Sequence, residues 1–206
     1  MDTSLYRSIN HLAVHTAWLH PLMKLAALDF VGLFGVLVLA GWWWARSAPE
    51  PARAVAAAVW SAGATLLAVW GNQLIVQAVK RPRPFLVVTQ AEVLVHRSSD
   101  YSFPSDHAVA AGAATVGLWI LARYGVPHAR RLAQAATALA LVVAFARVYV
   151  GVHYPGDVLA GLGVGGAVAV VGWFIVRTWL SRTLSLLANK RLLRRLVVAK
   201  AHSTAT

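Results

Sequence analysis

The sequence predicts an all-α membrane protein, a polytopic helix bundle of five to six spans that begins with an amphipathic helix. Of its 206 residues, 59% are hydrophobic and 13% are charged, whereas soluble domains average about 45–50% apolar and about 25% charged residues. The mean hydropathy is +0.62, and five long apolar segments follow one another along the chain. Because these segments use more than half of the length, we expect a single domain over 1–206.

The N-terminal segment is more polar than the rest. Residues 5–22 carry Arg7, His11, His15 and His20 beside apolar side chains. This mixture favours an amphipathic helix at the membrane surface over a sixth span, so 1–24 is expected to be an interfacial segment. The pattern of a cleavable signal peptide is absent, and we expect the segment to be retained.

Five apolar segments have the length that a bilayer requires, about 20 residues each. They cover 25–45, 54–79, 107–124, 132–150 and 158–180. Alanine and glycine are frequent in them, which suits close packing between membrane helices. The remaining residues, 181–206, form a basic tail.

Lysine and arginine are distributed unequally between the two sides that alternating spans define. Twelve of the 19 lie in 46–53, 123–131 and 177–200, and seven lie elsewhere. Since cytoplasmic loops are the basic ones, we expect the tail to be cytoplasmic and the loops 80–106 and 151–157 to face outward. The net charge of +12 is explained by a basic juxtamembrane tail and predicts no nucleic-acid partner.

Three polar clusters fall at span ends on the outer side, where ionisable groups indicate function. Arg83 and Arg147 offer planar cationic forks that match phosphate oxygens, and Ser105 adds a hydroxyl donor at the start of the third span, where free backbone N–H groups favour an anion. Lys80 is equally consistent with phosphate contact and with anchoring at head groups. The set predicts a phosphate site that needs no metal, and the lack of cysteine excludes thiolate chemistry.

A histidine and a carboxylate follow in the last cluster. Asp157 lies four residues after His153, within about one helical turn if Pro155 starts the fifth span. A carboxylate bonded to one ring nitrogen would hold the tautomer in which the other nitrogen can attack phosphorus. His107, from another helix end, could protonate the leaving oxygen and then activate water.

These residues resemble the type-2 phosphatidic acid phosphatase superfamily, whose motifs are KxxxxxxRP, PSGH and SRxxxxxHxxxD. Arg83-Pro84 matches the end of the first motif, Pro104-Ser105-x-His107 the second, and Arg147-x5-His153-x3-Asp157 the third. The resemblance implies a nucleophilic role for His153, an orienting role for Asp157 and a general-acid role for His107. It also implies that the phosphate ligands are Arg83, Ser105 and Arg147, and that no cofactor is needed.

The sequence departs from these motifs at three positions. Val76 stands where the first motif has lysine, Asp106 replaces the glycine of the second motif, and Ala146 replaces the serine of the third. Asp106 is expected either to stabilise the start of its helix or to select the substrate. Residues 72–75, 81–85 and 103–107 resemble the bacitracin-resistance branch, undecaprenyl pyrophosphate phosphatases that recycle the bacterial cell-wall lipid carrier.

The expected function is hydrolysis of undecaprenyl or another polyprenyl diphosphate to the monophosphate through a phosphohistidine. The partners would be this lipid and the bilayer of the bacterial inner membrane, with the active site facing outside and the oligomeric state left open. One alternative is a phosphatidic acid or phosphatidylglycerol phosphate phosphatase. Another is a transporter or antibiotic-efflux component, because apolar spans with buried charges also suit a permeation path.

Overall fold

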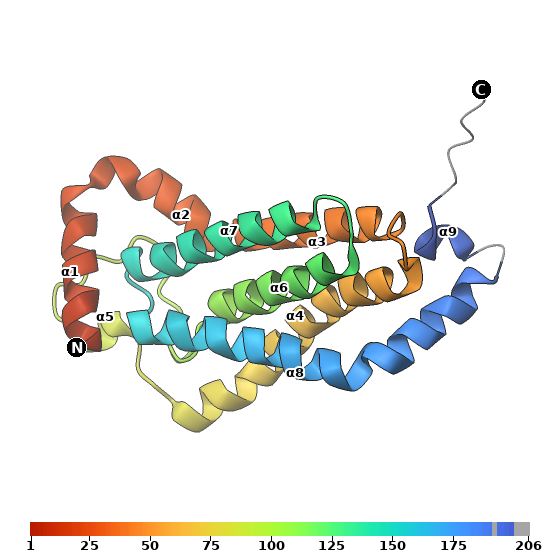
Figure 1. Ribbon diagram of the computed structural model, residues 1–206. Coiled ribbons are helices and arrows are strands. Elements are labelled where there is room, and N and C mark those ends of the chain that lie inside the picture. The colour runs from red at the N-terminus through yellow and green to blue at the C-terminus, as the bar shows by residue number, and fades with distance from the viewer. Residues whose placement is uncertain (191–192, 200–206) are drawn as a thin grey trace.

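A computed structural model describes residues 1–190 and 193–199, and these residues form a bundle of helices that lie side by side (Figure 1). The helices in chain order are α1 (Asp2–His15), η1 (Ala17–Leu19), α2 (His20–Leu28), α3 (Val31–Ala45), α4 (Pro51–Val79), α5 (Pro84–Val87), α6 (Asp106–Leu121), η2 (Ala122–Tyr124), α7 (Ala129–Tyr149), α8 (Pro155–Ala188) and α9 (Arg194–Val197). The predicted all-α class is confirmed.

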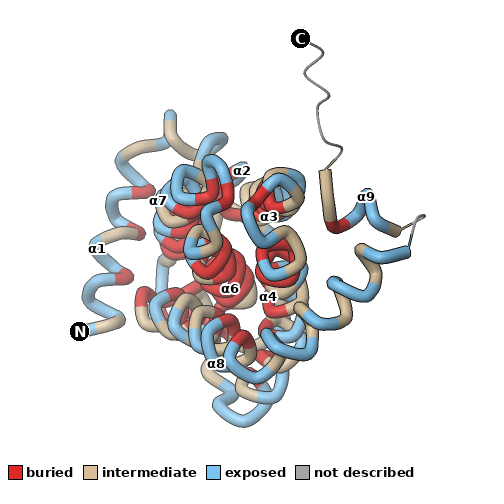
Figure 2. Tube along the Cα trace, turned by 45° about the vertical axis from the view of Figure 1, so that its right-hand side comes forward, coloured by how far each residue is buried: buried red, intermediate tan, exposed pale blue. Residues whose placement is uncertain are grey.

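Helix α6 is the centre of the bundle and is buried along most of its length (Figure 2). It packs against α3, α4, α7 and α8. Two glycines permit the approach of α8, because a Cβ at Gly112 would clash with the backbone of Leu162, and one at Gly165 would clash with the backbone of Val109. Small residues thus let these two helices approach at backbone distance.

Within 1–190 and 193–199, three helices are long and apolar enough to cross a membrane, or up to four if one bent pair forms a single span. The predicted spans 54–79, 132–150 and 158–180 correspond to α4, α7 and α8. The predicted span 25–45 is interrupted near Asp29, where the segment 17–28 and α3 meet at a bend of 52°. The predicted span 107–124 corresponds to α6 together with η2, which continues it to Tyr124. Length and composition alone identify three or four spans among the described residues, and the number of five to six stays a prediction.

Helix α1 lies across one end of the bundle instead of along it (Figure 1). Its 14 residues extend about 21 Å, too short for the roughly 30 Å hydrocarbon layer. Tyr6, Asn10 and Ala13 are buried against the protein, and their spacing places them on one face of the helix. The predicted segment 5–22 is therefore two elements, α1 and the start of the bent pair, separated at Thr16.

The predicted tail, 181–206, begins inside α8, which continues to Ala188. Helix α9 follows, and Trp42 and Arg46 near the end of α3 donate hydrogen bonds to backbone carbonyls of Leu196 and Arg195. Residues 191–192 and 200–206 of the tail lie outside the described part of the chain.

Candidate active site

Three loops meet at the end of the bundle that α1 covers. They are the segment after α4, the long segment before α6 and the tight turn between α7 and α8. Gly151 makes this turn with a φ of 87°, and a Cβ there would clash with the carbonyl of Glu92 in the long segment. The turn is thereby held against the neighbouring loop, and His153 follows two residues later.

A cavity of about 300 Å³ opens between these loops. Four of the residues expected in the site, Arg83, His107, Arg147 and His153, line it together. The remaining lining residues are Leu28, Val76, Val95, His96, Ser98, Asp100, Tyr101, Pro104, Asp106 and Val152. Asp157, Ser105 and Lys80 are not among the lining residues, although Ser105 caps the helix that carries His107.

The two arginines of the cavity converge on one nitrogen of His153. The distance from Arg147 Nη2 to His153 Nε2 is 3.1 Å, and that from Arg83 Nη1 to the same nitrogen is 3.4 Å. Both arginines are buried, with exposed fractions of 7% and 5%. The guanidinium groups therefore lie where they can donate hydrogen bonds to the oxygens of a phosphoryl group that Nε2 attacks.

Two buried donors of the predicted site have no hydrogen-bond partner among the described residues, the hydroxyl of Ser105 and Nε of Arg147. An unsatisfied buried polar group costs about 1–3 kcal/mol. Such groups need an explanation, and an anionic ligand that accepts hydrogen bonds from them provides one.

The other nitrogen of His153 is held by the backbone. Nδ1 lies 2.8 Å from the carbonyl oxygen of Ser102, and a carbonyl can only accept a hydrogen bond. The proton of the neutral ring is therefore on Nδ1, and the unprotonated Nε2 accepts hydrogen bonds from the arginines. Burial above all, together with the charges of Arg147 and Arg83, lowers the pKa of His153 to about 4 despite the opposing effect of Asp157.

Asp157 is close to His153 but is mainly bonded elsewhere. Its Oδ2 is 3.7 Å from His153 Nδ1, beyond normal hydrogen-bond length, and accepts instead from the backbone N–H of Tyr154 at 2.8 Å. Its Oδ1 accepts from Arg81 at 2.7 Å. Helix α8 does begin at Pro155, as the spacing argument required, but the direct partner of Nδ1 is the Ser102 carbonyl, which sequence reasoning missed.

Asp100 is a second residue that the sequence analysis did not single out. Its carboxylate accepts from Arg83 Nη2 at 2.7 Å and from Arg83 Nε at 3.1 Å. Burial raises the pKa of Asp100, but hydrogen bonds from Ser98 and Arg83 outweigh it, so the net pKa is lowered. Asp100 thus fixes one edge of the Arg83 guanidinium while Nη1 faces His153. Its only signal in the sequence is its place in the motif loop.

Two of the three motif departures line the cavity, and the third, Ala146, is fully buried. Val76, at the position of the missing lysine, lines the cavity, so a lysine there could reach the site. Lys80 ends α4 in a left-handed conformation and is exposed, and it does not line the cavity. Asp106 lines the cavity and accepts hydrogen bonds from Asn72 at 2.7 Å and from Gln73 at 3.0 Å, both on α4.

No group of three or more His, Cys, Asp or Glu side chains that could hold a metal ion occurs within 1–190 and 193–199. The arrangement, an imidazole nitrogen between two arginines in a membrane helix bundle, suits the binding of a phosphoryl group. The sequence profile of the PAP2 superfamily matches residues 57–181. The chain therefore belongs to the PAP2 superfamily and is a membrane phosphatase.

Similar proteins carry three different descriptions. Undecaprenyl-diphosphatase BcrC of Bacillus subtilis is 27% identical over 177 residues, which are 86% of this chain and 83% of the relative. Bacitracin transport permease protein BcrC of Bacillus licheniformis is 26% identical over 172 residues, or 82% and 79% of the two chains. The crystal structure of a PAP2 type phosphatidylglycerolphosphate phosphatase from Bacillus subtilis has a TM-score of 0.58 at 24% identity, with 91% and 87% of the chains covered.

Proposed function

We propose that this phosphatase hydrolyses a polyprenyl diphosphate, with undecaprenyl diphosphate as the expected substrate, to the monophosphate through a phosphohistidine at His153. The observation that supports this most directly is the unprotonated ring nitrogen, Nε2, which lies 3.4 Å from Arg83 and 3.1 Å from Arg147. The ring is oriented by the Ser102 carbonyl without any contribution from the substrate.

The reaction has two steps. In the first, Nε2 attacks the terminal phosphorus, the bond from this phosphorus to the bridging oxygen breaks, and His107 gives a proton to that oxygen as the lipid monophosphate leaves. In the second, the now neutral His107 takes a proton from water, which attacks the phosphohistidine and releases inorganic phosphate. Arg83, Arg147 and Ser105 stabilise the charge on the transferring group in both steps.

The lipid substrate is supported by the cavity and by the first relative. A cavity of about 300 Å³ is at the small end of ligand sites and suits a head group whose tail remains in the bilayer. Leu28, Val76 and Val95 give the cavity an apolar side. The name of the Bacillus subtilis relative, undecaprenyl-diphosphatase, favours a polyprenyl diphosphate over the glycerolipid phosphates.

The deciding experiment measures phosphate release from undecaprenyl diphosphate, phosphatidate and phosphatidylglycerol phosphate by the purified protein, with and without chelator. We expect the diphosphate to be hydrolysed fastest and the rate to be unchanged by chelator. Both His153→Ala and His107→Ala should lose activity, while Ser8→Ala, on the exposed face of α1, should not. Equal or greater turnover of a glycerolipid would contradict the proposed substrate, and loss of activity with chelator would contradict the metal-free mechanism.

A transport function is the second candidate, because the Bacillus licheniformis relative is named a bacitracin transport permease. Export and substrate hydrolysis both lower the sensitivity of a cell to a compound that sequesters a lipid phosphate. The sensitivity of cells that express His153→Ala distinguishes export from hydrolysis. The phosphatase proposal predicts that protection is lost with the histidine, whereas protection by a stably expressed His153→Ala variant would support transport.

We also propose that the active site faces outside and that the C-terminus is cytoplasmic, on the basis of the uneven lysine and arginine distribution. The chain has no cysteine, so single cysteines can be introduced without background. Thr89→Cys, exposed in the loop before α6, and Asn189→Cys, exposed after α8, report opposite sides. In intact spheroplasts an impermeant maleimide should label Thr89→Cys alone, and the reverse pattern would invert the orientation.

A further inference from the structure

The first residues of α1 reach into the network around the nucleophile. Asp2 Oδ2 accepts a hydrogen bond from Arg81 Nη2 at 2.6 Å, and Asp2 Oδ1 accepts from the backbone N–H of Gly156 at 2.8 Å. Gly156 lies in the first turn of α8, directly before Asp157. The Asp2 carboxylate therefore connects Arg81, in the loop after α4, to the first turn of α8, which carries Asp157.

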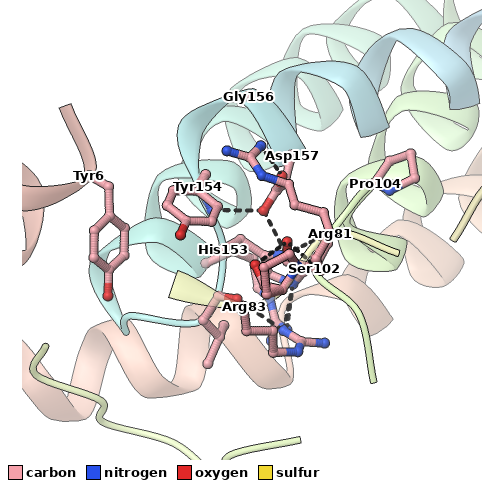
Figure 3. A network of polar contacts seen from close by, with 12 residues as sticks. Tyr6, Arg81, Arg83, Ser102, Pro104, His153, Tyr154, Gly156 and Asp157 are labelled. Atoms are coloured by element: carbon pink, nitrogen blue, oxygen red, sulfur yellow. Dashed lines mark hydrogen bonds and ion pairs between the residues drawn. The ribbon is translucent and has the colours of Figure 1, made fainter. Parts of the chain in front are cut away.

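Arg81 connects this carboxylate to Asp157. Its Nη1 donates to Asp157 Oδ1 at 2.7 Å, and its guanidinium lies 4.0 Å above the ring of Tyr154 (Figure 3). Burial lowers the pKa of Arg81, but hydrogen bonding with Asp2 and the charges of both carboxylates outweigh it and raise the pKa overall. Arg81 thus holds the Asp157 carboxylate, whose side chain is fully buried.

The backbone of Arg81 holds the other partner of His153. The carbonyl of Arg81 accepts the N–H of Ser102 at 2.9 Å and also lies 3.3 Å from its hydroxyl. Ser102 in turn accepts from His153 Nδ1 through its own carbonyl. A single residue is therefore bonded to both residues that face Nδ1, to Ser102 through its backbone N–H and hydroxyl and to Asp157 through its carboxylate.

We propose that Arg81 is a positioning residue for His153 and that Asp2 of α1 holds Arg81 in place, so that α1 is part of the catalytic unit. In this role the side chain of Arg81 offsets the charge of Asp157, 3.7 Å from Nδ1, while its backbone fixes Ser102. Arg81 does not line the cavity and is not assigned a contact with the substrate.

Helix α1 has anchors that do not depend on Asp2. Asn10 exchanges two hydrogen bonds with the backbone of Glu92, at 2.8 and 2.9 Å. Tyr6 donates from its hydroxyl to the carbonyl of Gly151 at 3.1 Å. Replacing Asp2 by asparagine therefore removes one ion pair without undocking the helix, which makes the substitution a clean probe.

The inference rests on the proposed phosphohistidine at His153, and a pH profile tests it. The charged and titratable groups around His153 are Arg83, Arg147, Asp157 and His107. In Arg81→Gln the Asp157 charge is no longer offset, which favours the protonated imidazole. The acidic limb of kcat/KM should move to higher pH by about one unit. Because Asp157 also loses the hydrogen bond that holds its carboxylate in place, and misplaced catalytic groups react slowly, kcat should fall about tenfold with little change in KM.

Arg81→Lys keeps the positive charge, so the acidic limb of its kcat/KM profile should stay at the wild-type pH. Asp2→Asn should lower kcat about threefold without raising the limb, and should have no further effect in the Arg81→Gln background, because coupled residues are not additive. Ser8→Ala, on the exposed face of α1, is the matched control. The inference would be overturned if the acidic limb of Arg81→Gln lay at the wild-type pH. It would also be overturned if the effects of Arg81→Gln and Asp2→Asn on kcat were fully additive.

The failure of this inference is distinct from that of the proposed function. If His153→Ala retains activity, the phosphohistidine is wrong. If His153→Ala is inactive while Arg81→Gln and Asp2→Asn match wild type, only the positioning role is wrong. Should Arg81→Gln not fold, Arg81→Lys and Asp2→Asn still decide, because unchanged kcat in both would overturn the role.

Discussion

The substitution Asp157→Asn separates two accounts of how His153 is oriented. If the carboxylate held the Nδ1 proton, its loss would remove the correct tautomer and cost about 10⁴-fold in kcat, as in serine protease triads. The Ser102 carbonyl is 2.8 Å from Nδ1, and Asp157 is 3.7 Å away. The tautomer should therefore survive in Asp157→Asn.

The remaining effect of Asp157 is electrostatic. A unit charge at 3.7 Å interacts with the imidazolium by about 4 kcal/mol at an effective dielectric constant near 20. Arg81, bonded to the same carboxylate at 2.7 Å, offsets about half of this, so that about 2 kcal/mol remains, or about 30-fold in kcat. Because Asp157 raises the pKa of His153, its removal should move the acidic limb to lower pH, opposite to Arg81→Gln.

The assay is steady-state phosphate release between about pH 2.5 and 9, with the folded state of each variant checked by thermal unfolding in detergent. A loss near 10⁴-fold would refute the reasoning, because it would mean that the carboxylate, and not the backbone, fixes the ring. An unchanged rate would refute the electrostatic contribution.

Three further predictions follow from the same contacts. His153 must be unprotonated to attack, and its lowered pKa of about 4 predicts that wild-type kcat/KM falls only as the pH drops toward 4; a limb near 6.5, after correction for substrate ionisation, would contradict it. Ser105→Ala removes a hydroxyl without a partner among the described residues, so kcat/KM should fall about tenfold with an unchanged melting temperature; a lowered melting temperature would show a structural role. Gly165→Ala should lower the free energy of unfolding by about 1–3 kcal/mol because its Cβ meets the backbone of α6, whereas Gly163→Ala, with open space around it, should not; equal melting temperatures would contradict the packing.

The sequence predicted the convergence of the main site residues because they fall at span ends on one side. Arg83, His107, Arg147 and His153 line one cavity as the motif order required. The Ser102 carbonyl could not be predicted, because a backbone acceptor leaves no mark in residue type. The Asp2–Arg81 pair joins residues 79 positions apart, and no local pattern relates them.

The fold was predicted in class more closely than in detail. Hydropathy identified the long helices because an apolar segment of bilayer length has few other structures available. The bend near Asp29 was missed since the apolar pattern continues on both sides of it. The predicted span 107–124 corresponds to α6 and η2, and the sequence did not show that this helix is enclosed by other helices.

The central claim is that His153 carries the phosphoryl group during turnover. The most direct measurement is rapid alkaline quenching of the enzyme during turnover of undecaprenyl diphosphate, followed by mass spectrometry of its peptides. We predict an acid-labile, alkali-stable phosphate on His153 that is absent from His153→Ala. Turnover at the wild-type rate with no phosphate on His153, or with the phosphate on another residue, would contradict the account.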